Sequence, residues 1–334
     1  MSAHNNKTCV IAGDIGGTKT NIGLFAQGKS RPILKRMEQY PSQQTPGLEA
    51  VLERFISKYE TSIQAACFGV AGEVNNGLAK ITNLPWNVSV KSFRHRFGWP
   101  RVKVINDLTA TALAIPFLKA SELFPLNHIR VRKGKNIGLV APGTGLGESI
   151  LVFEDGKYIP VASEGGHVDF APTNEKEVEL WRYLHSRYSH VSKERVLSGR
   201  GIVNIYSWLR DTGVYKEPSW LRKKITEIDP AQAITEAALN RNQPLARRTL
   251  DIFVSILGSV AGNLALSGTT SGGVFLGGGI PPKILPKLKE GSFMESFTSK
   301  GQFKRFNEKI PVRVILNDRA ALLGAACHAF SLLE

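Results

Sequence analysis

The chain has 334 residues, 42% hydrophobic and 21% charged, which is enough material for two domains with ordinary globular cores. Its formal net charge is +15, but the basic residues are dispersed. The densest basic groups, at 130–135 and 222–224, lack interleaved aromatic residues, so a nucleic-acid partner is not expected. The three cysteines (Cys9, Cys67 and Cys327) lie far apart, which argues against disulfides and a Cys-rich zinc site and favours a reducing compartment.

No targeting or membrane segment is expected. The N-terminal stretch Ser2–Lys7 is polar and lacks the apolar run of a signal peptide. The most apolar segment, Phe253–Ser267, is too short to span a bilayer and contains Asn263, so it predicts a buried helix. Together with the cysteine usage, these features predict a cytoplasmic protein without a membrane partner.

Residues 10–29 predict two strands joined by a tight loop, since two apolar runs flank the string GDIGGT at Gly13–Thr18. Glycines let backbone N–H groups approach phosphate oxygens and form an anion nest, and Thr18 adds a hydroxyl donor. Asp14 is a candidate for holding a Mg²⁺-bound water, because Mg²⁺ prefers oxygen ligands and keeps several waters. The alternative is an ordinary hairpin turn.

The string GLFAQGKS at Gly23–Ser30 matches the Walker A pattern, but that motif works only between a strand and a helix. Here Gly23–Ala26 falls inside the second predicted strand, and Pro32 argues against a following helix. We therefore interpret this match as accidental.

Asn106 and Asp107 follow the apolar run 102–105 and precede an Ala/Leu-rich helix. Strand ends are where α/β proteins place their chemistry, and a carboxylate there suits proton acceptance from a hydroxyl nucleophile. The structural alternative is equally open from the residues alone: either side chain can cap the helix.

A second hairpin is predicted over 137–157, with a glycine-rich turn at Gly143–Gly145 that suits a second phosphate clamp. Beyond it, Glu164, His167 and Glu194 have the planar polar groups that bind several sugar hydroxyls at once. On the residues alone, a surface charge for Glu194 and a core or metal-binding histidine for His167 remain the favoured alternatives. Helical periodicity then covers most of 175–267.

Three pairs of segments recur in the same order, which indicates an internal duplication. They are the hairpins 10–29 and 137–157, the strands 67–73 and 274–280, and the strand–Asn-Asp–helix segments 104–114 and 314–325. The span is 90 residues from Gly17 to Asp107 but 173 from Gly145 to Asp318, so helices enlarge the second copy. We predict an α/β protein with two lobes facing a cleft: 1–115 with 319–334, and 116–318, the last helix packing on the first lobe.

With duplicated α/β lobes and Gly/Thr hairpins, the chain resembles the actin-like (ribonuclease H-like) ATPase clan. Within that clan it is similar to the bacterial glucokinase family, on the strings GDIGGTKT, TNLPW, VINDLTA, GTGLG, EGGHVDF, ERVLSGRG, FLGGGI and NDRAALLGAA. The resemblance extends from about Val10 to Phe330.

The resemblance implies an ATP- and Mg²⁺-dependent kinase that phosphorylates glucose at the entry of glycolysis. It implies Asp107 as the catalytic base, Asp318 as only a helix cap, and sugar contacts from Asn106, Asp107, Glu164, His167 and Glu194. It also places a loop at Gly277–Gly279 near the nucleoside, for which strand termination is the alternative. The residues expected to contact ATP are Gly13, Asp14, Ile15, Gly16, Gly17, Thr18, Gly143, Thr144, Gly145, Gly277, Gly278 and Gly279.

Several other functions are weighed against this one. The absence of cysteine between Cys67 and Cys327 excludes the zinc motif of the related repressor/kinase family, and no helix-turn-helix is expected before the first strand. The remaining alternatives are a kinase for another hexose and a non-catalytic sugar- or nucleotide-binding regulator, with ATP, ADP and polyphosphate all open as donors. A homodimer with only small-molecule substrates is expected.

Overall fold

The computed structural model describes residues 8–59, 62–81 and 84–334, so Ser2–Lys7 and the first two residues of TNLPW, Thr82 and Asn83, lie outside the described residues. The chain divides into two compact units: unit 1 comprises 1–120 and 317–334, and unit 2 comprises 121–316. The division expected from the sequence placed the two boundaries at 115/116 and 318/319.

Unit 1 is built on a five-stranded sheet with the order β3-β2-β1-β4-β8. β1 and β2 form an antiparallel hairpin, β2 pairs antiparallel with β3, and β1, β4 and β8 run parallel. A small three-stranded sheet, β5-β6-β7, accompanies it. The strands are β1 (Cys9–Ile15), β2 (Lys19–Ala26), β3 (Ile33–Pro41), β4 (Ile63–Val70), β5 (Val74–Asn75), β6 (Leu78–Lys80), β7 (Asn87–Ser89) and β8 (Val102–Asn106).

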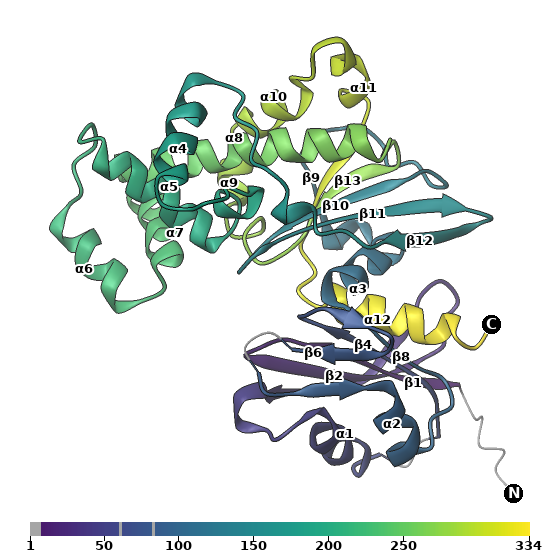
Figure 1. Cartoon of the computed structure of the whole chain (residues 1–334). Coiled ribbons are helices and arrows are strands. Elements are labelled where there is room, and N and C mark those ends of the chain that lie inside the picture. The colour runs from purple at the N-terminus through teal and green to yellow at the C-terminus, as the bar shows by residue number, and fades with distance from the viewer. Residues whose placement is uncertain (1–7, 60–61, 82–83) are drawn as a thin grey trace, which may run out of the picture. The chain divides into compact units, whose positions relative to one another are not determined.

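Helices cover both faces of this sheet (Figure 1). Because side chains alternate along a strand, Ile11 of β1 packs with α1 (Leu48–Ile56) and α2 (Val90–Phe97), while Val10 and Ala12 pack with α3 (Asp107–Ala114) and α12 (Ala320–Ser331). The helices α3 and α12 approach very closely, since a Cβ on Gly324 would lie only 1.7 Å from the carbonyl oxygen of Ala110. The small side chains of both helices therefore bring α3, which follows Asn106, tightly onto the sheet.

Unit 2 repeats the plan with one added strand, in the order β12-β11-β10-β13-β14-β9. β10 and β11 form the hairpin, β11 pairs antiparallel with β12, β10, β13 and β14 run parallel, and β9 adds an antiparallel edge. The prediction of duplicated α/β lobes is thereby confirmed. The strands are β9 (Leu123–Pro125), β10 (Ile137–Pro142), β11 (Leu146–Glu154), β12 (Lys157–Val161), β13 (Gly273–Leu276) and β14 (Val312–Ile315).

The extra length of unit 2 is helical, as the periodicity predicted, with α4–α7 grouped beside the long helix α8 (Figure 1). The buried face of α8 includes Leu250, Phe253 and Leu257, which share one core with Val140 of β10 and Val274 of β13. The helices are α4 (Glu175–His185), α5 (Gly199–Asp211), α6 (Ser219–Glu227), α7 (Pro230–Arg241), α8 (Pro244–Ser267), α9 (Leu285–Leu288), α10 (Ser292–Thr298) and α11 (Lys304–Asn307).

The length expected for the apolar helix was wrong. The helix begins at Pro244 rather than Phe253, and with 24 residues it is long and apolar enough to cross a membrane. However, 78% of its most apolar 18-residue window is buried by the rest of unit 2. Its apolar character is therefore explained by its place in the core, as the sequence predicted.

The Walker-like string lies in a strand–turn–strand context. Gly23–Ala26 belongs to β2, and the next long element is β3. The prediction that no helix directly follows this string is confirmed, so the string lacks the strand-to-helix context that a Walker A motif needs.

Candidate active site

The first glycine loop is a tight turn at the carboxyl end of β1. Only residues 16–18 form the turn, since Gly13, Asp14 and Ile15 belong to β1. The backbone N–H of Gly16 donates to the carbonyl of Lys19 (3.0 Å), and Ser42 holds the carbonyls of Gly16 and Thr18 through its hydroxyl and its N–H (2.8 and 3.0 Å). Ser42, which fixes the conformation of this loop from a distant segment, carries no signal for this role in the sequence.

Asp14 is a partly buried carboxylate just before this turn. The side-chain amide of Asn21 donates to Asp14 Oδ2 (3.4 Å), and Gln39 in turn donates to Asn21 (3.0 Å). Burial raises the pKa of Asp14 to about 6, the Asn21 hydrogen bond opposes this, and the negative charge of Asp107 adds to it. The ends of β1 and β8 therefore bring two carboxylates within electrostatic reach of one another.

No group of three or more His, Cys, Asp or Glu side chains in the described parts of the chain is arranged to hold a metal ion. A weakly partnered carboxylate next to the first glycine loop nevertheless fits Mg²⁺ that arrives with a nucleotide, because Mg²⁺ binds through few protein carboxylates and keeps its waters. Asp14 is the residue of unit 1 that would face such an ion.

The structure shows how Asn106 and Asp107 contribute to the cap of α3. Asn106 is the N-cap of α3: its Oδ1 accepts from the N–H of Leu108 (2.9 Å) and Thr109 (3.4 Å), and its amide donates to the Gly72 carbonyl. Asp107 is the first residue of the helix, and its Oδ1 accepts from the same N–H of Leu108, also at 2.9 Å. Burial raises the pKa of Asp107, while hydrogen bonds from backbone N–H groups and from the Asn106 side chain oppose this. Asn106 accepts two backbone N–H groups and Asp107 shares one of them, so capping falls mainly to Asn106.

The expectation that Asp318 caps the last helix was wrong. α12 begins at Ala320, and it is Asn317 whose Oδ1 accepts the N–H of Arg319 (2.8 Å). The Asp318 side chain is 92% exposed and lies 4.0 Å from Arg319 Nε. The turn before α12 takes its hydrogen bond from the asparagine, as the turn before α3 does.

Two glycine loops lie side by side in unit 2 because they follow the parallel neighbours β10 and β13. The N–H of Gly143 donates to the carbonyl of Gly145 (2.8 Å), which closes the hairpin turn. The N–H of Ile280 donates to the carbonyl of Pro142 (3.2 Å), so the loop Gly277–Gly279 is tied to it. Gly278 needs its lack of a side chain, since its φ is +77° and a Cβ would lie 2.4 Å from the carbonyl oxygen of Pro142.

The three sugar-site candidates of unit 2 belong to two adjoining short 3₁₀ turns, Gly165–His167 and Lys193–Arg195, with Glu164 as the N-cap of the first. His167 Nε2 lies 4.0 Å from Glu194 Oε2, and these side chains are 61% and 30% exposed. Glu194 also accepts the N–H of Leu146 (3.0 Å), the residue that follows the glycine turn Gly143–Gly145. Glu194 is therefore no plain helix-surface charge and His167 no core histidine, and Glu164 is likewise exposed.

Sequence reasoning missed a buried ion pair beneath this cluster. Lys193 Nζ donates to both carboxylate oxygens of Glu148, at 3.0 and 3.1 Å, with side chains only 14% and 5% exposed. Burial raises the pKa of Glu148, and the charge of Lys193 opposes this. A Cβ on Gly165 would lie 2.7 Å from Glu148 Oε2, so the pair joins β11 to both of these 3₁₀ turns. The sequence carries no signal for this pair, because Glu148 follows Gly147 in a predicted strand and Lys193 has the character of an ordinary surface lysine.

The geometry agrees with the comparisons to known proteins. The family model described as glucokinase matches residues 11–331, nearly the whole chain. This chain belongs to the glucokinase family. The prediction of a glucokinase-type sugar kinase is thereby confirmed at the level of the family.

Individual relatives support the same assignment. A glucokinase of Nostoc punctiforme is 38% identical, covering 96% of this chain and 99% of its own. The crystal structure of a glucokinase from an Antarctic psychrotroph matches with a TM-score of 0.87 at 30% identity, covering 97% and 99% of the two chains. A ROK family glucokinase from Streptomyces griseus, solved with glucose and AMPPNP, shares the fold at a TM-score of 0.65 and 22% identity, covering 97% and 99%. The predicted actin-like ATPase fold is confirmed by these glucokinase-family neighbours.

Proposed function

We propose that this glucokinase-family chain transfers the γ-phosphoryl group of ATP to the 6-hydroxyl of glucose, with Asp107 as the base. The observation that carries this assignment is the division of labour at the start of α3. Asn106 supplies the helix cap, and Asp107 remains a half-buried carboxylate whose pKa is raised toward the working range of a general base.

In the proposed reaction Asp107 accepts the proton of the sugar hydroxyl as that oxygen bonds to phosphorus and ADP leaves. Phosphoryl transfer depends mainly on positioning and electrostatic stabilisation, so one well-placed carboxylate is sufficient as the base. Near Asp107, the cap residue Asn106 is placed to help orient the sugar. Its amide is already held by Gly72, which restricts its rotation.

The sugar contacts assigned to unit 2 are Glu164, His167 and Glu194. Their proximity supports the assignment, since His167 and Glu194 lie 4.0 Å apart and the short turns that carry them adjoin. Charged and planar acceptors of this kind distinguish hydroxyl stereochemistry, because an inverted or absent hydroxyl leaves a polar group unpaired. Glucose is the proposed sugar, in line with the Streptomyces griseus glucokinase that was solved with glucose.

The nucleotide contacts are proposed for the backbone N–H groups of three loops: Gly13–Thr18, Gly143–Gly145 and Gly277–Gly279. AMPPNP in the Streptomyces griseus structure supports an ATP-type donor for this family. The Mg²⁺ that accompanies ATP would be met by Asp14 through water, and it would neutralise charge on the phosphates. The proposal also includes a homodimer, which light scattering tests by measuring the mass of the protein in solution. It further places the reaction at the entry of glycolysis, in the cytoplasm.

A coupled assay that crosses glucose, galactose, fructose and mannose with ATP, ADP and polyphosphate tests this function. We expect glucose with ATP to exceed the other combinations in kcat/KM by up to about 10⁴-fold, the limit for sites that bind substrate hydroxyls directly. Equal rates on all hexoses would contradict the specificity but leave a hexose kinase. Binding of sugar and nucleotide without any turnover would instead show a regulator.

A further inference from the structure

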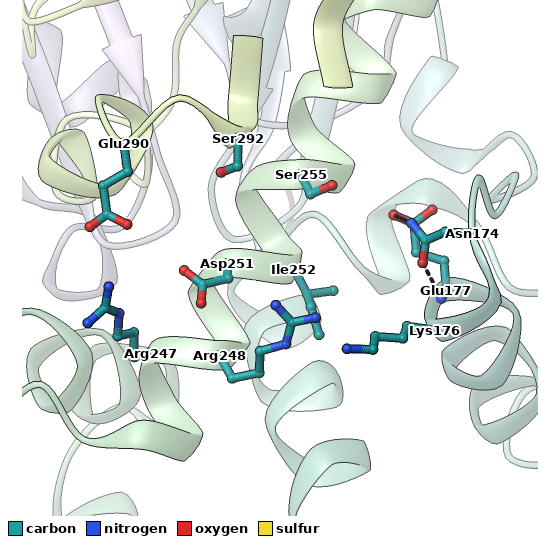
Figure 2. Close-up of a pocket in the computed structure, with 10 residues that line it drawn as sticks. All are labelled: Asn174, Lys176, Glu177, Arg247, Arg248, Asp251, Ile252, Ser255, Glu290 and Ser292. Atoms are coloured by element: carbon teal, nitrogen blue, oxygen red, sulfur yellow. Dashed lines mark hydrogen bonds between the residues drawn. The ribbon is translucent and has the colours of Figure 1, made fainter. Parts of the chain in front are cut away.

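Unit 2 contains a polar cavity that none of the residues assigned above lines (Figure 2). Its volume is about 360 Å³, within the range of small-molecule sites. The start of α4, the first half of α8 and the α9–α10 connection form its walls. The lining residues are Asn174, Lys176, Glu177, Arg247, Arg248, Asp251, Ile252, Ser255, Glu290 and Ser292.

The carboxylates of this cavity are already occupied by internal partners. Glu177 accepts from the N–H and hydroxyl of Thr173 and from the Asn174 amide, at 2.7–2.9 Å, which uses both of its oxygens. Asp251 and Glu290 both pair with Lys287, whose side chain is only 4% exposed. The carboxylate oxygens of the lining are therefore already bonded inside the protein, to neutral donors at Glu177 and to the one shared ammonium group of Lys287 at Asp251 and Glu290.

The cations are not compensated in the same way. Lys176 and Arg248 have no hydrogen-bond or ion-pair partner within the described part of the chain, and Arg247 bonds only the neutral side chain of Asn242 (3.0 Å). Figure 2 shows Lys176, from α4, and Arg248, from α8, reaching toward one another from different helices. Like charges that converge across a recess repel, and an anion between them removes this repulsion.

We propose that this cavity is a binding site for a phosphate-bearing anion, separate from the substrate site. Arginine and lysine bind phosphate oxygens through charge-assisted hydrogen bonds, and two such groups from different helices define a position between them. Because α8 also packs against β10 and β13, which carry the glycine loops of unit 2, an occupied cavity is positioned to influence them. The ligand class is a phosphate monoester or inorganic phosphate.

Isothermal titration of the full-length protein with inorganic phosphate and, separately, glucose 6-phosphate tests this site. Saturating glucose and AMPPNP are present throughout, so that the substrate site is filled. We expect one anion per chain for the wild type and at least tenfold weaker binding for the double variant Lys176→Ala/Arg248→Ala. Tighter binding of glucose 6-phosphate would identify a sugar phosphate as the source, and equal binding would identify the bare phosphate group.

The matched control is Arg132→Ala/Lys133→Ala, which removes the same charge from another exposed part of unit 2. It should bind both probes like the wild type. If it loses affinity as strongly as the cavity variant, general charge attraction explains the binding and the proposal fails. The proposal also fails if neither probe binds the wild type. The single variant Arg248→Gln keeps the first three side-chain carbons and a polar end but removes the charge, and it should also weaken anion binding, which guards against damage to α8.

Discussion

The two units repeat one topology, yet the Asn-Asp sequence that follows the last parallel strand of each sheet has different surroundings in its two copies. In unit 1, Asn106 caps α3 and the following Asp107 is half-buried with a raised pKa. In the second copy, which follows β14 of unit 2 but itself belongs to unit 1, Asn317 accepts a backbone N–H before α12, and the side chain of Asp318 is 92% exposed. The asparagine therefore serves the fold in both copies, whereas burial decides whether the neighbouring aspartate is equipped for chemistry.

The hairpins differ in the same manner. Counted from the last pair of each hairpin, Asp14 opposite Asn21 in unit 1 corresponds to Ala141 opposite Gly147 in unit 2. One pair further back, the buried Ile22 corresponds to the buried Glu148. Unit 1 thus places its carboxylate beside the first glycine loop, and unit 2 places one next to the 3₁₀ turns Gly165–His167 and Lys193–Arg195, where Lys193 pairs with it.

The largest effect is expected at Asp107, for which Asp318, the aspartate that follows the other asparagine, serves as the control. Asp107→Asn keeps the shape and the bond from Leu108 but removes the base, so kcat should fall by about 10²–10⁴. Asp318→Asn, the matched control, should leave kcat and stability near wild type. Steady-state kinetics with glucose and ATP measure both. Equal losses of kcat in the two variants would show that the burial of Asp107 does not distinguish it from Asp318.

The buried pair of unit 2 predicts the next largest effect, on stability. Lys193→Met leaves the Glu148 carboxylate buried without its partner, which should lower the free energy of unfolding by about 3–5 kcal/mol at neutral pH. The loss should shrink as the pH falls, because the burial-raised pKa of Glu148 lets protonation remove the unpaired charge. Denaturant unfolding at several pH values measures this.

The double variant Lys193→Met/Glu148→Leu has an apolar side chain at position 148, as unit 1 has with Ile22 at the corresponding position, and it should recover most of the stability. Glucose KM should rise in Lys193→Met, because the pair supports the turns that carry Glu164 and Glu194. If the double variant is as unstable as the single one, the carboxylate is not the source of the loss.

Glu164 and Glu194 should separate sugar binding from structural support. Each Ala substitution should raise glucose KM by about 10- to 150-fold, the equivalent of one charge-assisted hydrogen bond of roughly 1.5–3 kcal/mol. Only Glu194→Ala should also lower stability, by about 1–3 kcal/mol, because Leu146 N–H loses its acceptor. Thermal unfolding and kinetics on both variants measure the difference. An unchanged KM in both would remove these carboxylates from the sugar site.

The sequence predicted the elements well where pattern and turn chemistry agreed. The hairpins, the strand–Asn-Asp–helix segments and the helical enlargement of unit 2 all carry local signals of this kind, and the structure has each of them. The helix caps were harder to predict, because Asn and Asp side chains both accept backbone N–H groups. The choice depends on the residue at which the helix begins, and the structure shows Asn106 and Asn317 accepting these N–H groups.

Long-range contacts to the site had no local signal. Ser42 reaches the first glycine loop across 26 residues, and Lys193 reaches Glu148 across 45 residues. Neither residue stands in a recognisable motif, and both depend on how distant segments pack. The motif residues were therefore visible in the sequence, while the side chains that hold them in place were not.

The smallest effect is expected from Asp14, whose counterpart in unit 2 is Ala141. Its pKa is raised from 3.8 to about 6, so the folded protein binds this proton more strongly than the unfolded chain. The stabilising contribution is therefore complete below about pH 4 and is lost as the pH rises through about 6. Asp14→Asn should remove this dependence, so that the variant gains about 1–2 kcal/mol over wild type between these pH values.

Part of that shift comes from the charge of Asp107, so Asp107→Asn should lower the pKa of Asp14 toward its ordinary value. Thermal unfolding between pH 4 and 8, without nucleotide, compares the wild type, each single variant and the double variant. Parallel pH profiles for the wild type and Asp14→Asn would show that Asp14 titrates normally. Water would then already reach the Asp14 carboxylate, and having a carboxylate here instead of Ala141 at the same place in unit 2 would not affect stability.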